Sequence, residues 1–139
     1  VPYLLAGNDT SILRKTLIQE QKLAVSVHVA YDPLTLGPGV FKVRILPKEG
    51  VTLQQIEEAY DALIDKVKTM GFESEQLNSA KNVLKSQLIF RLDGFIRMSF
   101  ELIDLVMKNK DEQYFNNYEA ALDSLDKSQV ENAFKTILD

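Results

Sequence analysis

The side chains that could bind a metal ion or act as nucleophiles are few in this chain. Its 139 residues include one histidine, His28, and no cysteine. A structural or catalytic zinc site draws three or four ligands from histidine nitrogens, thiolates and carboxylates. His28 has no second histidine or thiolate to act with it, so we predict that the chain holds no metal. A serine nucleophile is equally unsupported, because no serine stands in a G-x-S-x-G turn.

Two pairs of carboxylates, Glu57/Glu58 and Glu73/Glu75, are the remaining candidates for acid–base chemistry. Such chemistry needs two carboxyl groups in different environments around a cleft. Neighbouring glutamates on the outer side of an amphipathic helix are solvated alike, so we predict no catalytic residue in this chain.

Composition limits the remaining functions. The formal net charge is −4, which argues against nucleic acid, because phosphate recognition requires a concentrated basic surface. A hydrophobic content of 45% in 139 residues suits one ordinary soluble globular domain. We expect a soluble compartment, bacterial periplasm or cytoplasm, which composition does not identify. No apolar run approaches the roughly 20 residues that span a bilayer, so we expect no membrane span.

The only histidine stands in a segment of strictly alternating polarity. Residues 24–31 place Val25, Val27, Val29 and Tyr31 on one side and Ala24, Ser26, His28 and Ala30 on the other. Residues 39–47 alternate in the same way, with Phe41, Val43 and Ile45 opposite Lys42 and Arg44. A period of two predicts strands with one face in a core. We expect an antiparallel pair joined by the connector 32–38, with Ser26, His28, Lys42 and Arg44 on its polar face.

Helical periodicity covers most of the remaining chain. We predict helices over 10–23 (capped by Asp9 or Thr10), from Thr52 to Gly71, from Ser74 to a break at Asp93-Gly94, and over 95–108, 111–123 and 127–138 (opened by Asp126 or Ser128). Thr52 and Gln55 have the spacing of a capping box. The predicted fold class is therefore α+β, with an antiparallel sheet covered on one face by helices in two layers.

Two strands alone form a marginal sheet with open edges. We therefore expect residues 1–139 to be a single but incomplete domain, truncated from a longer polypeptide. The opening Val-Pro-Tyr in place of methionine agrees with that expectation. Further strands would come from the flanking sequence or from a partner.

The segment 95–107 is apolar almost all round and contains Arg97, Glu101 and Asp104. A helix without a polar face is usually buried on several sides, which predicts an internal core helix. The alternative is an interface helix that docks on another domain or subunit. In that case the chain would self-associate into a homodimer, and substitution of Leu102 or Val106 would abolish the dimer.

Three segments carry a family resemblance. The first segment consists of Ser11, Leu13, Leu17 and Glu20 (shifted by one), followed by Leu23, Ala24, Ser26 and Val27. The second opens the next long helix with Glu75, Leu77, Ala80 and Lys81. The third lies at the last helix and consists of Leu125, Val130 and Ala133. Their order over about 130 residues resembles the non-catalytic second-half (C-terminal) domain of insulinase/pitrilysin-like zinc metallopeptidases, also called inverzincins.

The resemblance implies a division of labour. The H-x-x-E-H zinc site of such peptidases lies in another domain or subunit, which is the expected partner, so zinc belongs to the parent assembly and not to this chain. Some family domains supply an arginine and a tyrosine to the substrate. These positions correspond to Ile18 and Val25 here, so the pair is lost. The chain is then expected to form part of a chamber for unfolded peptides, with Ser26, His28, Lys42 and Arg44 facing the substrate.

Two alternatives remain open. The chain is either part of an active peptidase or a proteolytically inactive scaffold subunit of the same family, and the loss at Ile18 and Val25 suits the second. An H-x-x-E-H segment about 200 residues upstream would favour the peptidase. An unrelated α+β binding module is the third interpretation. By itself, this chain should cleave nothing.

Overall fold

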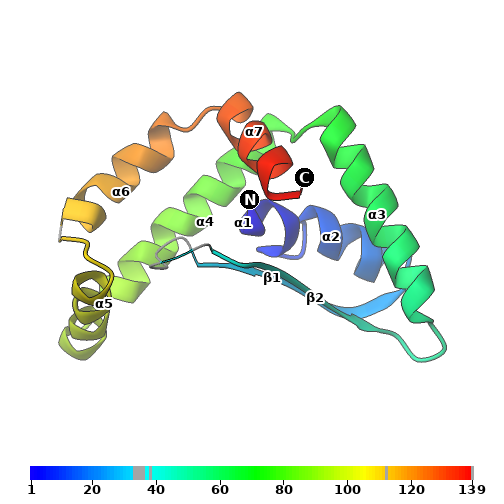
Figure 1. Ribbon diagram of the computed structural model, residues 1–139, viewed down its shortest axis with the longest axis horizontal. Coiled ribbons are helices and arrows are strands. Elements are labelled where there is room, and N and C mark those ends of the chain that lie inside the picture. Colours follow the sequence, from blue (N-terminus) through cyan, green and yellow to red (C-terminus); the bar gives the residue numbers. More distant parts are fainter. Residues whose placement is uncertain (33–36, 38, 112, 139) are drawn as a thin grey trace.

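The computed structural model describes residues 1–32, 37, 39–111 and 113–138. The elements in chain order are α1 (Pro2–Ala6), α2 (Ile12–Arg14), the π-helical turn η1 (Lys15–Glu20), β1 (Ala24–Tyr31), β2 (Phe41–Pro47), α3 (Leu53–Met70), α4 (Ser74–Leu92), α5 (Phe95–Met107), α6 (Gln113–Ser124) and α7 (Lys127–Leu138). Figure 1 shows an arch in which α1 and α2 lie directly on the hairpin, with α3 at one end and α5 at the other. The predicted α+β class is confirmed.

The two strands pair antiparallel, as predicted, from Ala24 opposite Pro47 to Tyr31 opposite Phe41. The alternation of β1 breaks at a β-bulge between Ala24 and Ser26. A bulge places two residues of one strand opposite one of the other, which shifts the faces on either side of it. As a result Ala24 is buried and Val25 is 58% exposed. The prediction that Val25 faces the core is therefore wrong.

On β2 the predicted alternation holds throughout. Phe41, Val43 and Ile45 pack against the core, and Lys42 and Arg44 are exposed. Most of the predicted connector, residues 33–36 and 38, lies outside the described residues. Within the described part of the chain the sheet has two strands, and nothing in that part supplies a third.

The N-terminal helical region differs from its prediction in two ways. The short helix α1, with Pro2 in its first turn, is one that the sequence analysis missed. Five residues are too few to show a helical period. The helix predicted over 10–23 runs only over residues 12–20, and its cap is Ser11, not Asp9 or Thr10. Its inward side chains Leu13 and Leu17 are fully buried, as predicted.

The later helices begin and end close to the predicted residues. The capping box of Thr52 and Gln55 opens α3, and Gly71, at a φ of 73°, ends it. That positive φ favours glycine. Glu73, one residue before the predicted Ser74, caps α4. Asp126 accepts a 2.8 Å hydrogen bond from the Gln129 amide at the start of α7, as predicted.

The hydrophobic core lies between the sheet and the helices α1, α2, α3 and α7. Its largest fully buried side chains are Phe72 and Phe134, whose rings meet edge to face at 5.2 Å between centroids. Leu5, Leu13 and Leu17 fill the space above the sheet. This core holds the strands in place and fixes which of their side chains face outward.

Helix α5 is not a core helix, and that prediction is wrong. Of its residues only Leu105 is buried, and Phe95 is 87% exposed. Gly94, at a φ of 87°, separates α5 from α4 and lets the chain turn sharply. Apolar composition around a helix predicts burial only when other elements surround it, and α5 packs mainly on α4 at the end of the arch (Figure 1).

Candidate functional site

The hairpin presents one exposed face, opposite the core. Ser26, His28, Lys42 and Arg44 are all exposed on it, and the pairing sets His28 directly opposite Arg44. Lys42 pairs with Ala30, two positions along the strands. The sequence therefore predicted correctly that these four residues share a face. Their contact with a substrate stays a prediction.

Lys42 and Arg44 give this exposed face a local positive charge. Neither side chain forms an ion pair with any residue that the structure describes. Beside them, the apolar side chain of Leu46 is 55% exposed. The face therefore offers cationic groups for carboxylates and an apolar group for side-chain contact, two properties that an unfolded peptide can use.

The positions at which the resemblance places an arginine and a tyrosine behave differently from each other. Ile18, in the π-helical turn η1, is half-buried and packs against the core. Val25 lies at the β-bulge and is exposed beside Ser26. Neither side chain can donate a hydrogen bond, so these two residues cannot stabilise a developing oxyanion.

A cavity of about 710 Å³ adjoins the exposed face. Residues 28–32 at the end of β1 line it, together with parts of α1, α4, α5 and α6. Successive residues of a strand point to opposite faces. Five consecutive lining residues therefore mean that the cavity borders the edge of β1, the edge not paired with β2. Its volume lies in the range of about 300–1,000 Å³ typical of ligand pockets.

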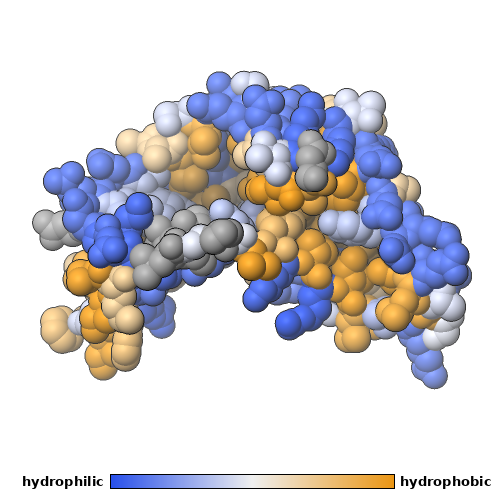
Figure 2. Space-filling view, in the orientation of Figure 1, coloured by the Kyte–Doolittle hydropathy of each residue, from blue (hydrophilic) through white to orange (hydrophobic). Residues whose placement is uncertain are grey.

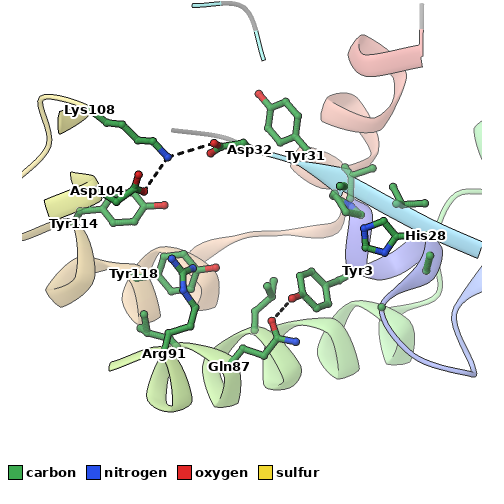
Figure 3. Close-up of a pocket in the computed structure, with 18 residues that line it drawn as sticks. Tyr3, His28, Tyr31, Asp32, Gln87, Arg91, Asp104, Lys108, Tyr114 and Tyr118 are labelled. Atoms are coloured by element: carbon green, nitrogen blue, oxygen red, sulfur yellow. Dashed lines mark hydrogen bonds and ion pairs between the residues drawn. The ribbon is translucent and has the colours of Figure 1, made fainter. Parts of the chain in front are cut away.

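Four tyrosines from three elements line this cavity: Tyr3 from α1, Tyr31 from β1, and Tyr114 and Tyr118 from α6. Figure 3 shows their rings around the space, with the Tyr3 hydroxyl donating to Gln87 of α4. Burial raises the pKa of Tyr114 and of Tyr118 above the usual value of a phenol. Both are therefore neutral at physiological pH and supply hydroxyl donors and ring surfaces.

The charged groups around the cavity are paired with one another. Lys108 Nζ lies 2.8 Å from Asp104 and 3.3 Å from Asp32 (Figure 3), and hydrogen bonding to Asp104 raises the lysine pKa. Arg91 Nε donates to Glu101 Oε1 at 2.9 Å, and this hydrogen bond raises the pKa of the guanidinium. The cavity is therefore polar at its rim without an excess of either sign.

Sequence reasoning found the exposed face and missed the cavity. Tyr114 and Tyr118 are spaced four residues apart and lie on one side of a helix, which was a readable signal. The cavity also depends on the placement of α1 and on the direction that α5 takes after Gly94. Neither of these follows from local periodicity.

The zinc that the resemblance implies does not fit the residues of this chain. Among the described residues, no group of three or more histidines or carboxylates could hold a metal ion. The lone imidazole of His28 stands on an exposed strand opposite the cationic Arg44. The paired glutamates at positions 57, 58, 73 and 75 are also exposed, without a cleft between them. We therefore derive no catalytic step at these residues.

Solved structures with the same fold include a protease and two proteins described as zinc proteases or their domains. The chain superposes on a protease from Helicobacter pylori with a TM-score of 0.86 and 18% identity, covering 99% of this chain and 33% of that one. A protein assigned as a zinc protease from Bordetella pertussis Tohama I gives 0.80 and 17%, with 96% and 72% covered. The inactive peptidase domain of such a protein from Bordetella parapertussis gives 0.80 and 17%, with 96% and 71% covered.

Because the sequence identities are low, these likenesses establish the fold alone. No protein-family profile matches the chain, and neither does any curated protein sequence. The chain spans about a third of the length of the Helicobacter protease. Within the described residues, no helix has the length and apolar character to cross a membrane. The α+β fold of this chain is thus similar to that of two zinc-protease structures, one of which is an inactive peptidase domain.

Proposed function

We propose that this chain is a non-catalytic domain of an insulinase/pitrilysin-like zinc peptidase and forms part of the chamber that holds unfolded peptides. The observation that carries the proposal is the fold shared with an inactive peptidase domain over 96% of the chain. The donor set of the described residues agrees, because it does not fit zinc. The zinc and its ligands would belong to another domain or subunit, in which a metal-bound water performs hydrolysis.

The exposed face of the hairpin would be the wall of this chamber. Lys42 and Arg44 stand two residues apart on β2 with no carboxylate partner in the described structure, and His28 lies opposite Arg44. Free cations at such spacing attract acidic side chains and a peptide carboxyl terminus. Leu46 adds an apolar contact to the same face. The expected preference is for unfolded peptides that carry acidic residues.

The tyrosine-lined cavity would extend the wall beyond His28. It borders the edge of β1, where backbone amide and carbonyl groups can pair with an extended chain. A folded protein does not offer such a chain, which is why the proposed substrates are unfolded peptides. The tyrosine rings would then contact the peptide side chains, whatever their sequence.

Peptide binding by the 139-residue chain tests this proposal. Fluorescence anisotropy of a labelled, unstructured acidic peptide should show saturable binding, weakened at least about tenfold in the double variant Lys42→Glu/Arg44→Glu, because two attractive charges become repulsive. The matched control is Lys66→Glu/Lys135→Glu. It makes the same change in net charge at exposed lysines on α3 and α7.

Equal weakening in both variants would show that only overall charge matters and would contradict a chamber wall at the hairpin. Absence of binding by the unaltered chain would contradict it as well. A basic peptide of the same length serves as the ligand control, and it should bind more weakly to the unaltered chain than to the Lys42→Glu/Arg44→Glu variant.

One observation favours a second candidate function, a proteolytically inactive scaffold subunit of the same family. Ile18 contributes to the core and Val25 is an exposed aliphatic residue, so neither of the two positions retains a group that could act on a substrate. The arginine–tyrosine pair could still be supplied by another subunit, which is why the peptidase assembly stays the first proposal. A scaffold predicts no peptide binding at Lys42 and Arg44.

We further infer that the chain is part of a larger domain. A two-stranded sheet is marginal by itself, and the Helicobacter protease extends far beyond the third of its length that matches this chain. Further strands would pair along the free edge of β2, which leaves the edge of β1 to the peptide. This inference predicts stronger protection of the β2 amides against hydrogen exchange in the parent polypeptide than in the 139-residue chain.

A further inference from the structure

Helix α5 carries a continuous apolar surface that no described residue covers. We call it the α5 patch, and its side chains are between 54% and 87% exposed: Phe95, Ile96, Phe100, Ile103, Val106 and Met107. Successive residues of a helix are rotated by about 100°, so these six occupy one side, and the opposite side contains the buried Leu105. Figure 2 shows the patch as the hydrophobic projection at the lower left.

The charged residues of α5 do not interrupt the patch. Glu101 binds Arg91 of α4, Asp104 binds Lys108, and the Arg97 guanidinium donates to the carbonyl oxygen of Phe90 at 2.9 Å. All three therefore bond within this chain, on the side of α5 away from the patch. The exposed surface is aromatic, aliphatic and Met-containing, without charge, which is the composition of an interface core.

The same contacts hold the patch in a fixed orientation. Lys108 also binds Asp32 beyond the end of β1, so α5 is tied to the sheet as well as to α4. Leu105, 2% exposed, anchors its inner side. A surface that is ordered before binding loses little conformational entropy when a partner docks on it.

The size of the patch matches a dimer interface. Aromatic side chains offer roughly 150–250 Å² each and aliphatic ones somewhat less, so the six exposed fractions amount to roughly 600–800 Å². The largest apolar patch on a typical monomer is about 300–600 Å². A stable protein–protein interface buries about 800 Å² on each partner. The patch is therefore at or above the upper end of what a monomer usually exposes and close to the size that one partner needs.

Charge distinguishes between a protein and a lipid surface as the occupant. Helices that lie on membranes combine an apolar face with a lysine- and arginine-rich polar face. The polar side of α5 has Arg97, Glu101 and Asp104, and the chain as a whole carries −4. That arrangement is repelled by anionic lipid. Two copies of the uncharged patch, in contrast, meet without opposing like charges, and α5 lies at the end of the arch where a second copy can reach it (Figure 1).

We propose that the α5 patch is a self-association surface, on which α5 of a second copy of this chain packs in a two-fold symmetric dimer. A two-fold contact uses the same surface on both partners, and the α5 patch is complementary to itself in polarity and charge. This proposal does not depend on peptide binding, because the α5 patch includes neither Lys42 nor Arg44 and none of the residues that line the cavity.

Sedimentation velocity across a dilution series from about 100 to about 1 µM tests the proposal. The unaltered chain should be dimeric at the upper concentration. Phe100→Glu and Val106→Glu should each weaken the dimer by at least about 30-fold, as expected for residues central to an interface. The matched control is Met70→Glu at the end of α3, which is 70% exposed, outside the patch, and should leave the dimer unchanged.

A monomer at every concentration would overturn the proposal, as would a dimer that persists in both α5 variants. Far-UV circular dichroism and urea midpoints close to those of the unaltered chain establish that each variant is folded. Flotation with neutral and anionic phospholipid vesicles completes the test. Binding to either vesicle that is lost in Val106→Glu, without dimer formation in solution, would assign the patch to a lipid surface and contradict the dimer.

Discussion

The body of the molecule and its α5 end bury apolar residues to very different degrees. In the body, helices α1, α2, α3 and α7 close over one face of the hairpin, and fifteen buried residues form one cluster. At the other end, α5 and α6 contribute one buried residue each, Leu105 and Leu122. Yet nine of the thirteen residues of α5 are apolar.

The comparison shows that apolar side chains have different roles in the two regions of this chain. In the body, apolar side chains provide the free energy of folding and hold the strands whose outer face is the proposed peptide surface. At the α5 end, ion pairs and one leucine hold a helix that presents its apolar side outward. The body is therefore expected to determine stability, and the α5 end to determine association.

The largest effect should come from the centre of the body. Phe134→Ala removes a ring that is 1% exposed and that contacts Phe72. We expect a loss of about 3–5 kcal/mol in the free energy of unfolding, measured in urea. The matched control, Phe95→Ala at the α5 end, removes the same ring from a site that is 87% exposed. At protein concentrations too low for the dimer it should change the value by less than about 0.5 kcal/mol. Similar losses would remove the distinction between the two regions.

A smaller and more local effect is expected from the anchor of α5. Leu105→Ala should increase hydrogen exchange of the α5 amides, because the helix loses its one buried side chain. Amides of α3 and α7 should keep their protection, since they belong to the body. Equal loss of protection in all three helices, measured by mass spectrometry, would show that the two regions unfold together.

The ion pair between Arg91 and Glu101 should contribute less. Its arginine is half-exposed, and exposed pairs contribute roughly 0–1 kcal/mol. Glu101→Gln should therefore lower stability by less than about 1 kcal/mol, and added salt should reduce the difference. A larger or salt-independent loss in urea titrations would mean that the pair, and not Leu105, holds α5 in place.

The smallest effect is a change of stability at alkaline pH. Burial raises the pKa of Tyr114 and Tyr118 in the folded state, so their phenols ionise later than in the unfolded chain. The stabilisation is complete below the unfolded pKa of about 10 and is lost as pH rises through the folded values. Replacement of both by Phe should flatten the decline of stability above that pH. An unchanged decline would place the titrating groups elsewhere, for example at Tyr60.

The sequence specified the strands better than the surroundings of the helices. Alternation located β1 at residues 24–31 without error, because a half-buried strand repeats every two residues. It could not reveal the bulge at Val25, since an inserted residue leaves the pattern of side-chain types unchanged. The polar face with His28 opposite Arg44 followed from the same period and was confirmed in its placement.

Tertiary surroundings were the part that periodicity could not supply. The stripe that identified α5 as a helix says nothing about whether another element covers it. The cavity depends on Tyr3, Tyr31 and Tyr118 meeting from three separate elements. Local sequence patterns do not encode such long-range contacts. The resemblance to zinc peptidases predicted the fold correctly. The proposed roles of the hairpin face and of α5 had to be inferred from the residues exposed on the surface.

The most direct test of the proposed role combines binding, metal content and cleavage in one preparation. The 139-residue chain is incubated with an unstructured acidic peptide and zinc, and the peptide is followed by anisotropy and mass spectrometry while bound zinc is measured on the washed protein. The account predicts that the peptide is bound and recovered intact, with zinc far below one ion per chain. Stoichiometric zinc, or cleavage of the peptide by the chain alone, would contradict it.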